Sequence, residues 1–360
     1  MESSLSSRSW CRSTLWGRVK MANDRDVWVF IEQTDRQIAD VSLELLSKAQ
    51  ELAGILGSRV YGVLCGHQVE MLAQVAIHHG ADVVLWADHP ELENYRTLPY
   101  AKVVAGLIEE HEPYIFLYGG TPVGRDLAPR VASAVRAGLT ADCTDLQIGD
   151  YVSRKDKQTF EGLLYQIRPA FGGNLIATIV NPTMHPQMAT VREGVMRRQG
   201  ADSTRLGVVE RITPAFDETD LVLQVLSRET RESTVDLKSA PVVVAGGAGI
   251  GSGESFRLIH DLANLLGGEV GASRAAVDAG YISQEHQVGQ TGTTVRPRLY
   301  IAAGISGAVQ HRAGMDEASK IIAINTDPNA PIFQIAHYRI VGDVAVVIPQ
   351  MIHALRERAK

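Results

Sequence analysis

The chain has 360 residues, more than a single hydrophobic core usually serves, so two domains are expected. Hydrophobic residues make up 45% of the sequence, charged residues 21% and aromatic residues 6%, which excludes a disordered, collagenous or coiled-coil chain. The formal net charge of -6 provides no broad positive field, which argues against nucleic acid or an anionic membrane as the main partner.

The cysteines and the apolar runs exclude further classes. Cys11, Cys65 and Cys143 lie far apart, without the short spacing of a zinc or iron–sulfur site, so we expect no metal. Their sparse, odd number is typical of a reducing compartment, and we expect the bacterial cytoplasm. The apolar runs fall short of the roughly 18 to 20 residues that span a bilayer, so an integral membrane protein is not expected.

The first twenty residues differ from the rest of the chain. They are rich in Ser and Arg and contain one acid, Glu2, before a second methionine, Met21. This composition is typical of a transit peptide, which would indicate the mitochondrial matrix, and equally of a vector or start-codon extension. We treat residues 1–20 as a disordered extension or tag and begin the first domain at residue 21.

A regular alternation of strands and helices follows. Strands are predicted over Val27–Glu32, Val60–Cys65, Asp82–Trp86 and Tyr114–Tyr118, with helices over Val41–Leu56, Val69–His78, Tyr100–Glu110 and Arg125–Val135. Strands that alternate with helices of this length predict parallel βαβ units.

The alternation of strands and helices stops after Thr140. The segments that follow, which predict a β-rich appendage, are TADCTDLQI, TFEGLLYQIR, NLIATIV and QMATVR. This appendage ends the first domain near residue 215. Residues 216–240 are predicted as a linker or hinge with one strand, Leu221–Leu226. A second α/β domain over residues 241–360 ends with VAVVIPQ and a helix over Met351–Arg358. The predicted fold class is therefore α/β with two domains, the first a parallel sheet with a β-rich appendage and the second Rossmann-like.

The second domain opens with a glycine-rich turn. Pro241–Ala245 leads into Gly246, Gly247, Gly249, Gly251 and Gly253 before a helix near Glu254. Such a turn lets backbone amides and a helix N-terminus approach a phosphate. The spacing matches neither GxGxxG nor a P-loop, so phosphate contact and a tight structural turn both stay open.

Two further segments carry candidate ligand groups. In VGASRAAVDAGYI, Ser273 and Arg274 follow a strand end, where the arginine either covers an anionic ring or phosphate or lies on the surface at a helix start. In VGQTG, the amides and Thr291 stand between two glycines, an arrangement that by itself also describes a turn.

The segment Leu299–Asn325 combines an apolar strand, small residues and polar side chains. Leu299–Ala303 leads to Ser306 and Gly307, then to Gln310 and His311, and a second strand ends at Asn325. This pattern predicts a dinucleotide-sized polar cleft at the carboxyl ends of parallel strands.

The run L-Y-I-A-x-G-I-S-G-A-V-Q-H-x-x-G, followed by I-x-A-I-N, resembles the signature of the α subunit of electron transfer flavoproteins. ASRAAVDAGY, VGQTG, DPNAPIFQIAHYRIVGD and the GG turn stand around it in the family order. The resemblance covers Asp26–Lys360 and is densest after Pro241.

The resemblance implies that the second domain holds FAD. Arg274 would lie against the isoalloxazine ring and stabilise its anionic one-electron-reduced form, Thr291 would hydrogen-bond N5, and His311 would face the pyrimidine carbonyl. The remaining implied residues divide by the part of FAD that they meet: Ser273, Val288, Gly289 and Gln290 the flavin; Ser306, Gly307, Ala308, Val309 and Gln310 the ribityl chain and pyrophosphate; Asn325, Asp343 and Val344 the adenosine.

One position departs from the family pattern. Relatives commonly carry GGRG where this chain has Ala248, so the glycine amides or another basic residue would have to replace an arginine at the pyrophosphate. No catalytic residue and no metal ligand is predicted.

The implied function is an electron carrier without substrate chemistry of its own. Its first domain would form a shared body with a β subunit. RPAFGGN and QMATVREGVM resemble the electron-bifurcating type, which implies an NADH-linked complex with an acyl-CoA dehydrogenase and ferredoxin, in the chemistry of fatty acid β-oxidation. The alternatives are a nicotinamide-dependent Rossmann-type dehydrogenase, a non-bifurcating respiratory electron transfer flavoprotein and a nucleotide-binding regulatory module.

Overall fold

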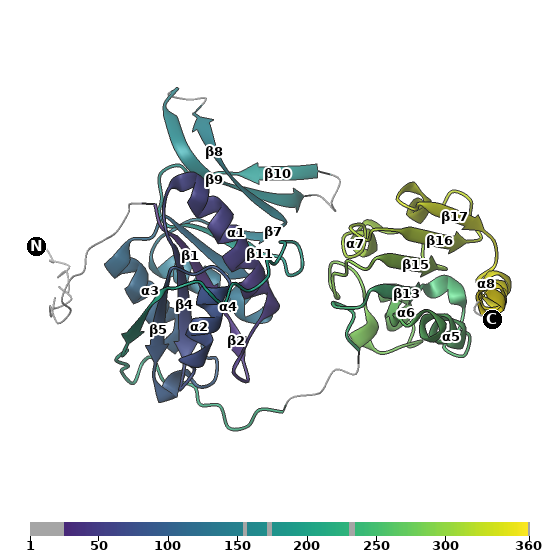
Figure 1. The fold of residues 1–360 in the computed structure, drawn as a ribbon, viewed down its shortest axis with the longest axis horizontal. Helices are drawn as coiled ribbons and strands as arrows, with labels where there is room; N and C mark the ends of the chain where they lie inside the picture. Colours follow the sequence, from purple (N-terminus) through teal and green to yellow (C-terminus); the bar gives the residue numbers. More distant parts are fainter. Residues whose placement is uncertain (1–24, 154–156, 171–174, 230–234, 359–360) are drawn as a thin grey trace, which may run out of the picture.

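The computed structural model describes residues 25–153, 157–170, 175–229 and 235–358, and it contains two α/β units (Figure 1). The strands and helices of the first unit lie between Val27 and Ile212, and those of the second between Val242 and Arg358. The two-domain α/β fold is thus confirmed. The extension predicted over residues 1–20 lies outside the described residues.

The first unit is built on a seven-stranded parallel sheet with the order β12-β5-β4-β1-β6-β11-β7. Its strands are β1 (Val27–Ile31), β4 (Val60–Gly66), β5 (Val83–Asp88), β6 (Ile115–Gly119), β7 (Leu139–Cys143), β11 (Gln187–Val191) and β12 (Val208–Ile212). All residues of β1 and β5 are buried, because both faces of the sheet are covered. This explains why these strands appear in the sequence as continuous apolar runs.

Four helices cover the sheet, as the sequence predicts. They are α1 (Asp40–Leu56), α2 (Met71–His78), α3 (Thr97–His111), which follows the short helix η1 (Pro90–Leu92), and α4 (Pro122–Ala134). Leu46 of α1 and Leu72 of α2 belong to one apolar core, while Val104 of α3 and Leu127 of α4 belong to another. Successive β1 residues alternate between these cores, so the helix pairs lie on opposite faces of the sheet.

The predicted β-rich appendage is only partly separate from this sheet. A three-stranded antiparallel sheet contains β8 (Asp145–Val152), β9 (Thr159–Ala170) and β10 (Leu175–Ile179), and a small hairpin joins β2 (Gln33–Thr34) to β3 (Gln37–Ile38). TADC and QMATV instead form β7 and β11 of the parallel sheet. All five residues of β11 are buried, since it lies inside the sheet.

The predicted linker is held by contacts at both ends. The strand predicted over Leu221–Leu226 is wrong: no strand forms there, and the Leu223 carbonyl accepts a hydrogen bond from Arg96 (2.8 Å) instead of from a sheet neighbour. Arg228 pairs with Asp35 of the first unit (2.8 Å). Leu237 is buried in a core of the second unit.

The second unit is a five-stranded parallel sheet with the order β14-β13-β15-β16-β17. Its elements in chain order are β13 (Val242–Gly246), η3 (Ala248–Ile250), α5 (Arg257–Leu266), β14 (Glu269–Ala272), α6 (Arg274–Asp278), η4 (Gln284–His286), β15 (Leu299–Ala303), α7 (Val309–Arg312), β16 (Ile321–Asn325), η5 (Pro331–Gln334), β17 (Tyr338–Val341) and α8 (Val344–Arg358). The strands predicted before the glycine-rich turn, before Ser273, over Leu299–Ala303 and before Asn325 are therefore present, as β13, β14, β15 and β16.

The last helix is longer than the sequence analysis predicts. It begins at Val344 rather than Met351, so VAVVIPQ is helical. Val344, Ile348 and Ile352 are buried at a spacing of four residues, which is the helical repeat, whereas Val346 is 55% exposed.

This burial pattern predicts unequal effects for two truncations in α8. Ile348→Ala should lower the free energy of unfolding by about 2 to 4 kcal/mol because it leaves a cavity, and Val346→Ala should change it by less than about 0.5 kcal/mol. Urea titration of the full chain measures both. Equal losses would support a strand, in which residues 346 and 348 share a face.

Candidate functional site

The carboxyl ends of β13 and β15 are a topological switch point. From β13 the chain continues to β14 on one side of the sheet, and it returns to β15 on the other side. Ligands of open α/β sheets bind outside the strand ends at such a point. The glycine-rich turn after β13 and the polar segment after β15 both lie at this edge.

The two turns at the switch point contact each other through their backbones. The Gly247 amide donates to the Ala303 carbonyl (2.8 Å), and the Gly249 amide donates to the Gly304 carbonyl (3.0 Å). A Cβ atom on Gly247 would lie 2.1 Å from the Gly304 oxygen, and Gly304 itself has a φ of 63°. Because these two amides are already used, the tight-turn interpretation holds for Gly247 and Gly249.

The segment after β15 presents free amides. Within the described part of the chain, the amides of Ser306, Gly307 and Ala308 have no hydrogen-bond acceptor. Gly307 has a φ of 87°, and a Cβ there would lie 2.2 Å from the Ile332 nitrogen. Val309 and Gln310 follow in the first turn of α7. Consecutive free amides in a glycine-containing turn form a concavity suited to an anion.

The VGQTG segment packs against the same turn. The Gln290 amide donates to the Gln310 carbonyl (2.7 Å), and the Val288 amide donates to the Ala272 carbonyl at the end of β14 (2.9 Å). The Gln287 side chain donates to the Thr291 hydroxyl (3.0 Å). Gly289 has a φ of 141°, and a Cβ there would lie 2.9 Å from the Gln310 oxygen. The three segments at β14, 288–291 and 306–311 therefore lie together.

Ser273 and Arg274 stand at the start of α6, as predicted. The buried Ser273 hydroxyl accepts a hydrogen bond from the Ala276 amide and so caps the helix (3.3 Å). The Arg274 side chain is 68% exposed and pairs with Asp278 (3.3 Å). Exposed ion pairs of this kind contribute little to stability, so the Arg274 guanidinium can leave Asp278 for a ligand at the strand edge at little cost.

His311 is a buried titratable group of the site. Its Nε2 is 3.0 Å from the Tyr300 hydroxyl, and its Nδ1 has no hydrogen-bond partner in the described residues. Burial lowers the pKa of His311 to about 4, with a smaller opposing effect from the Val288 backbone. The ring is thus neutral near pH 7.

The residues assigned to the adenosine end lie further along the strand edge. The Asn325 side chain donates to the Ile305 carbonyl (3.0 Å) and accepts from the Asp327 amide (2.9 Å). Asp343 accepts from the Ala345 amide at the start of α8 (2.8 Å), next to the buried Val344. Both side chains support local structure in addition to any contact with a ligand.

Sequence reasoning missed two residues of the site. Tyr300 lies inside the quoted Leu299–Asn325 segment and Gln287 directly precedes VGQTG, but neither received a role, since a tyrosine in an apolar strand and a glutamine before a turn carry no distinctive signal. Their contacts with His311 and Thr291 depend on which segments the fold brings together.

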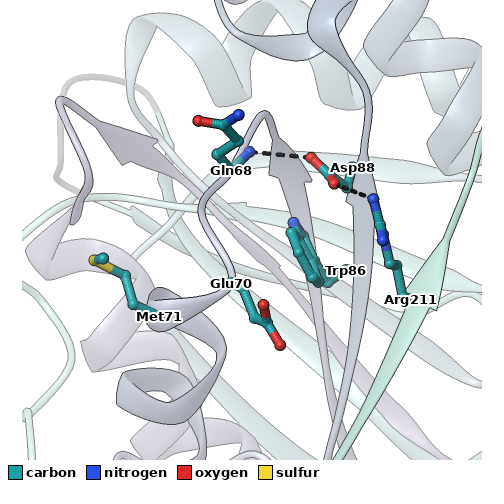
Figure 2. A pocket seen from close by; sticks show the side chains of 6 residues that line it. All are labelled: Gln68, Glu70, Met71, Trp86, Asp88 and Arg211. Carbon is teal, nitrogen blue, oxygen red and sulfur yellow. Dashed lines mark hydrogen bonds and ion pairs between the residues drawn. The ribbon is translucent and has the colours of Figure 1, made fainter.

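A cavity in the first unit lies beside β5 and β12 (Figure 2). Asp88 accepts hydrogen bonds from the Gln68 amide (3.0 Å) and from Arg211 (2.6 Å), whose guanidinium lies 5.3 Å from the centre of the Trp86 ring. Burial raises the pKa of Asp88, but Gln68, Arg211 and the nearby His67 together outweigh burial, so the pKa lies below its usual value. None of the cofactor-binding residues predicted from the sequence lines this cavity.

The second unit, with a cradle of free amides at its switch point, has the architecture of a dinucleotide-binding domain. The profile of the electron transfer flavoprotein domain matches residues 27–217, and that of the electron transfer flavoprotein FAD-binding domain matches residues 236–316. The chain belongs to the electron transfer flavoprotein alpha-subunit family, and its second unit is the FAD-binding domain. The resemblance seen in the sequence is confirmed.

Individual relatives agree with this assignment. An electron transfer flavoprotein subunit alpha of Thermoanaerobacterium thermosaccharolyticum is 49% identical over 94% of this chain and 99% of its own length. The subunit alpha of Megasphaera elsdenii is 45% identical over 94% of this chain and 98% of its own. The acryloyl-CoA reductase electron transfer subunit beta of Anaerotignum propionicum is 42% identical, covering 92% and 96% respectively.

The described residues hold neither a metal-binding cluster nor a membrane-spanning helix. They contain no cluster of three or more His, Cys, Asp or Glu side chains arranged to hold a metal ion. Over the same residues, no helix has the length and apolar character needed to cross a membrane. Cys65 and Cys143 are free thiols, and burial raises the pKa of each to about 12.

The low pKa of His311 predicts a loss of stability in acid. The unfolded chain binds a proton at this side chain below about pH 6.5, while the folded chain excludes it until about pH 4. At pH 4.5, relative to pH 7, wild type should lose about 2 to 3 kcal/mol of unfolding free energy more than His311→Leu does.

Urea unfolding of the full chain at both pH values measures this difference. The exposed His353 provides a control, because His353→Leu should retain the acid sensitivity of wild type. Identical pH dependence in wild type and His311→Leu would show that His311 titrates normally.

Proposed function

We propose that the chain is the FAD-carrying subunit of a heterodimer and passes electrons between dehydrogenases without substrate chemistry of its own. The observation that carries this proposal is the row of free amides from Ser306 to Ala308, next to the neutral His311 and near the end of β14 that bears Arg274. When bound, FAD supplies the capacity to accept and release electrons singly.

The proposed residue roles follow the order of segments along the edge. The amides of residues 306–310 hold the pyrophosphate and ribityl chain, which compensates for Ala248, an exposed side chain without charge. Ser273, Val288, Gly289, Gln290 and Thr291 line the flavin, and His311 faces its pyrimidine carbonyl. Arg274 supplies positive charge at the ring, and Asn325, Asp343 and Val344 meet the adenosine.

A β subunit is the proposed permanent partner, bound mainly by the first unit. Large apolar side chains remain exposed there, including Leu206 at 91% and Ile176 at 75%. Apolar surface of this kind is typical of protein contacts. The proposed boundaries stay at residues 21–215, 216–240 and 241–360. Residues 216–240 stay the proposed linker or hinge. The pair of Arg228 with Asp35 is exposed and therefore weak, while Leu237 is buried in the second unit.

The proposed redox partners are NADH, an acyl-CoA dehydrogenase and ferredoxin, in the cytoplasm and in chemistry of the fatty acid β-oxidation type. Support comes from the relative named as an electron transfer subunit of acryloyl-CoA reductase, a name that indicates a coenzyme A thioester substrate. A nicotinamide-dependent dehydrogenase is less consistent with the site. The histidine there has a pKa of about 4, too low for a general base near pH 7.

Removal of the Arg274 charge should make the bound flavin harder to reduce. Arg274→Ala should lower the first reduction potential by about 40 to 90 mV, equivalent to about 1 to 2 kcal/mol, because a positive charge favours added electrons. Arg356→Ala, which removes an exposed arginine of α8, is the control and should leave the potential unchanged. A spectroelectrochemical titration that finds both variants like wild type would remove Arg274 from the site.

The bifurcation proposal predicts that ferredoxin is required for turnover. The full chain purified with its β subunit should contain two FAD molecules and should oxidise NADH only when an acyl-CoA dehydrogenase, an enoyl-CoA and ferredoxin are all present. NADH oxidation is followed by absorbance. Turnover independent of ferredoxin, or a single FAD per heterodimer, would indicate a non-bifurcating respiratory type, and a colourless heterodimer would refute the flavoprotein assignment.

A further inference from the structure

Tyr300 is the buried partner of the histidine at the candidate site. It lies on β15 with 0% of its surface exposed, inside an apolar core of the second unit. Within the described residues, its hydroxyl has one hydrogen-bond partner, Nε2 of His311, at 3.0 Å. The two ring centres are 6.1 Å apart. The tyrosine therefore contacts the histidine through one polar bond, with the two rings tilted by 58°, in an otherwise apolar environment.

Both side chains are neutral, which limits how one proton can be placed between them. Burial raises the pKa of Tyr300 well above its ordinary value, so the phenol keeps its hydrogen. The low pKa of His311 leaves the imidazole with one N–H and one lone pair.

The two possible directions of the bond leave equal numbers of polar groups without partners. If the Tyr300 hydroxyl donates to Nε2, the ring hydrogen is on Nδ1, and that N–H and the phenol oxygen's lone pairs lack partners. If Nε2–H donates to the phenol oxygen, the phenol hydrogen and the Nδ1 lone pair lack partners. The two directions differ in the strength of the bond that is made. A phenol hydrogen is more acidic than the N–H of a neutral imidazole, and an imidazole nitrogen is a better acceptor than a phenol oxygen, so the first direction is favoured.

We propose that Tyr300 is a positioning residue of the flavin site, which fixes His311 as the Nδ1–H tautomer and so presents a hydrogen-bond donor to the pyrimidine carbonyl of FAD. This inference rests on the proposed contact of His311 with FAD. A donor at that carbonyl stabilises negative charge on the ring without carrying a charge itself. Tyr300 does so through the tautomer and never touches the cofactor.

The tautomer can be measured directly in the full chain labelled with 15N-histidine. Long-range 1H–15N correlation spectra should show His311 of wild type protonated at Nδ1. Tyr300→Phe should increase the Nε2–H form, because Nε2 then lacks a donor. Tyr118→Phe is the matched control: Tyr118 is also fully buried in a strand, but its hydroxyl has no partner in the described residues. It should leave the His311 signals unchanged.

The consequence for FAD is measured on the loaded full chain. Tyr300→Phe should weaken FAD binding about threefold to tenfold and lower the flavin reduction potential, whereas Tyr118→Phe should do neither. In a His311→Leu background, Tyr300→Phe should have no further effect on the potential, because the tyrosine acts only through the histidine.

Two results would overturn the inference. One is an Nε2–H tautomer in wild type, and the other is a shift of potential by Tyr300→Phe that persists without His311. Failure of the proposed function looks different. In that case His311→Leu would leave FAD affinity and potential unchanged, even if the tautomer were as predicted.

Discussion

The backbone contact between the turns after β13 and β15 is the constraint on which the FAD-binding domain depends. Gly247 and Gly304 approach so closely that a Cβ atom on Gly247 would lie 2.1 Å from the opposite carbonyl oxygen. This contact uses the amides of Gly247 and Gly249, whereas those of Ser306, Gly307 and Ala308 on the second turn have no acceptor in the described residues. Ala248 lies exposed on the first turn, so the proposed pyrophosphate contacts come from the second turn.

Arg274 and His311 differ in exposure and in charge. Arg274 is exposed and paired only with Asp278, so its charge can move toward a ligand at little cost. His311 is buried, and a charge on it would be strongly disfavoured, as its pKa of about 4 shows. In the proposed complex, Arg274 would stabilise negative charge on the flavin by its positive charge, and His311 would do so by a hydrogen bond.

The first unit also has a switch point, between β1 and β6, but the cavity there is lined by a carboxylate, Glu32. Thr121 caps α4 by accepting from the Gly124 amide, and its hydroxyl donates to the Glu32 carboxylate at the end of β1 (2.5 Å). Burial raises the pKa of Glu32. An anionic phosphate would meet this carboxylate at the helix N-terminus, so the same α/β architecture is used differently in the two units.

The sequence by itself determined the class of fold, the positions of most strands and helices and the segments that carry the site. Apolar runs of strand length and glycine motifs are local features, so the chain reveals them without its neighbours. Only the tertiary structure showed that VAVVIPQ is helical, that QMATV lies inside the parallel sheet, and that Tyr300 pairs with His311. These outcomes depend on which distant segments bury a residue or share its hydrogen bond, and neither periodicity nor composition records that information.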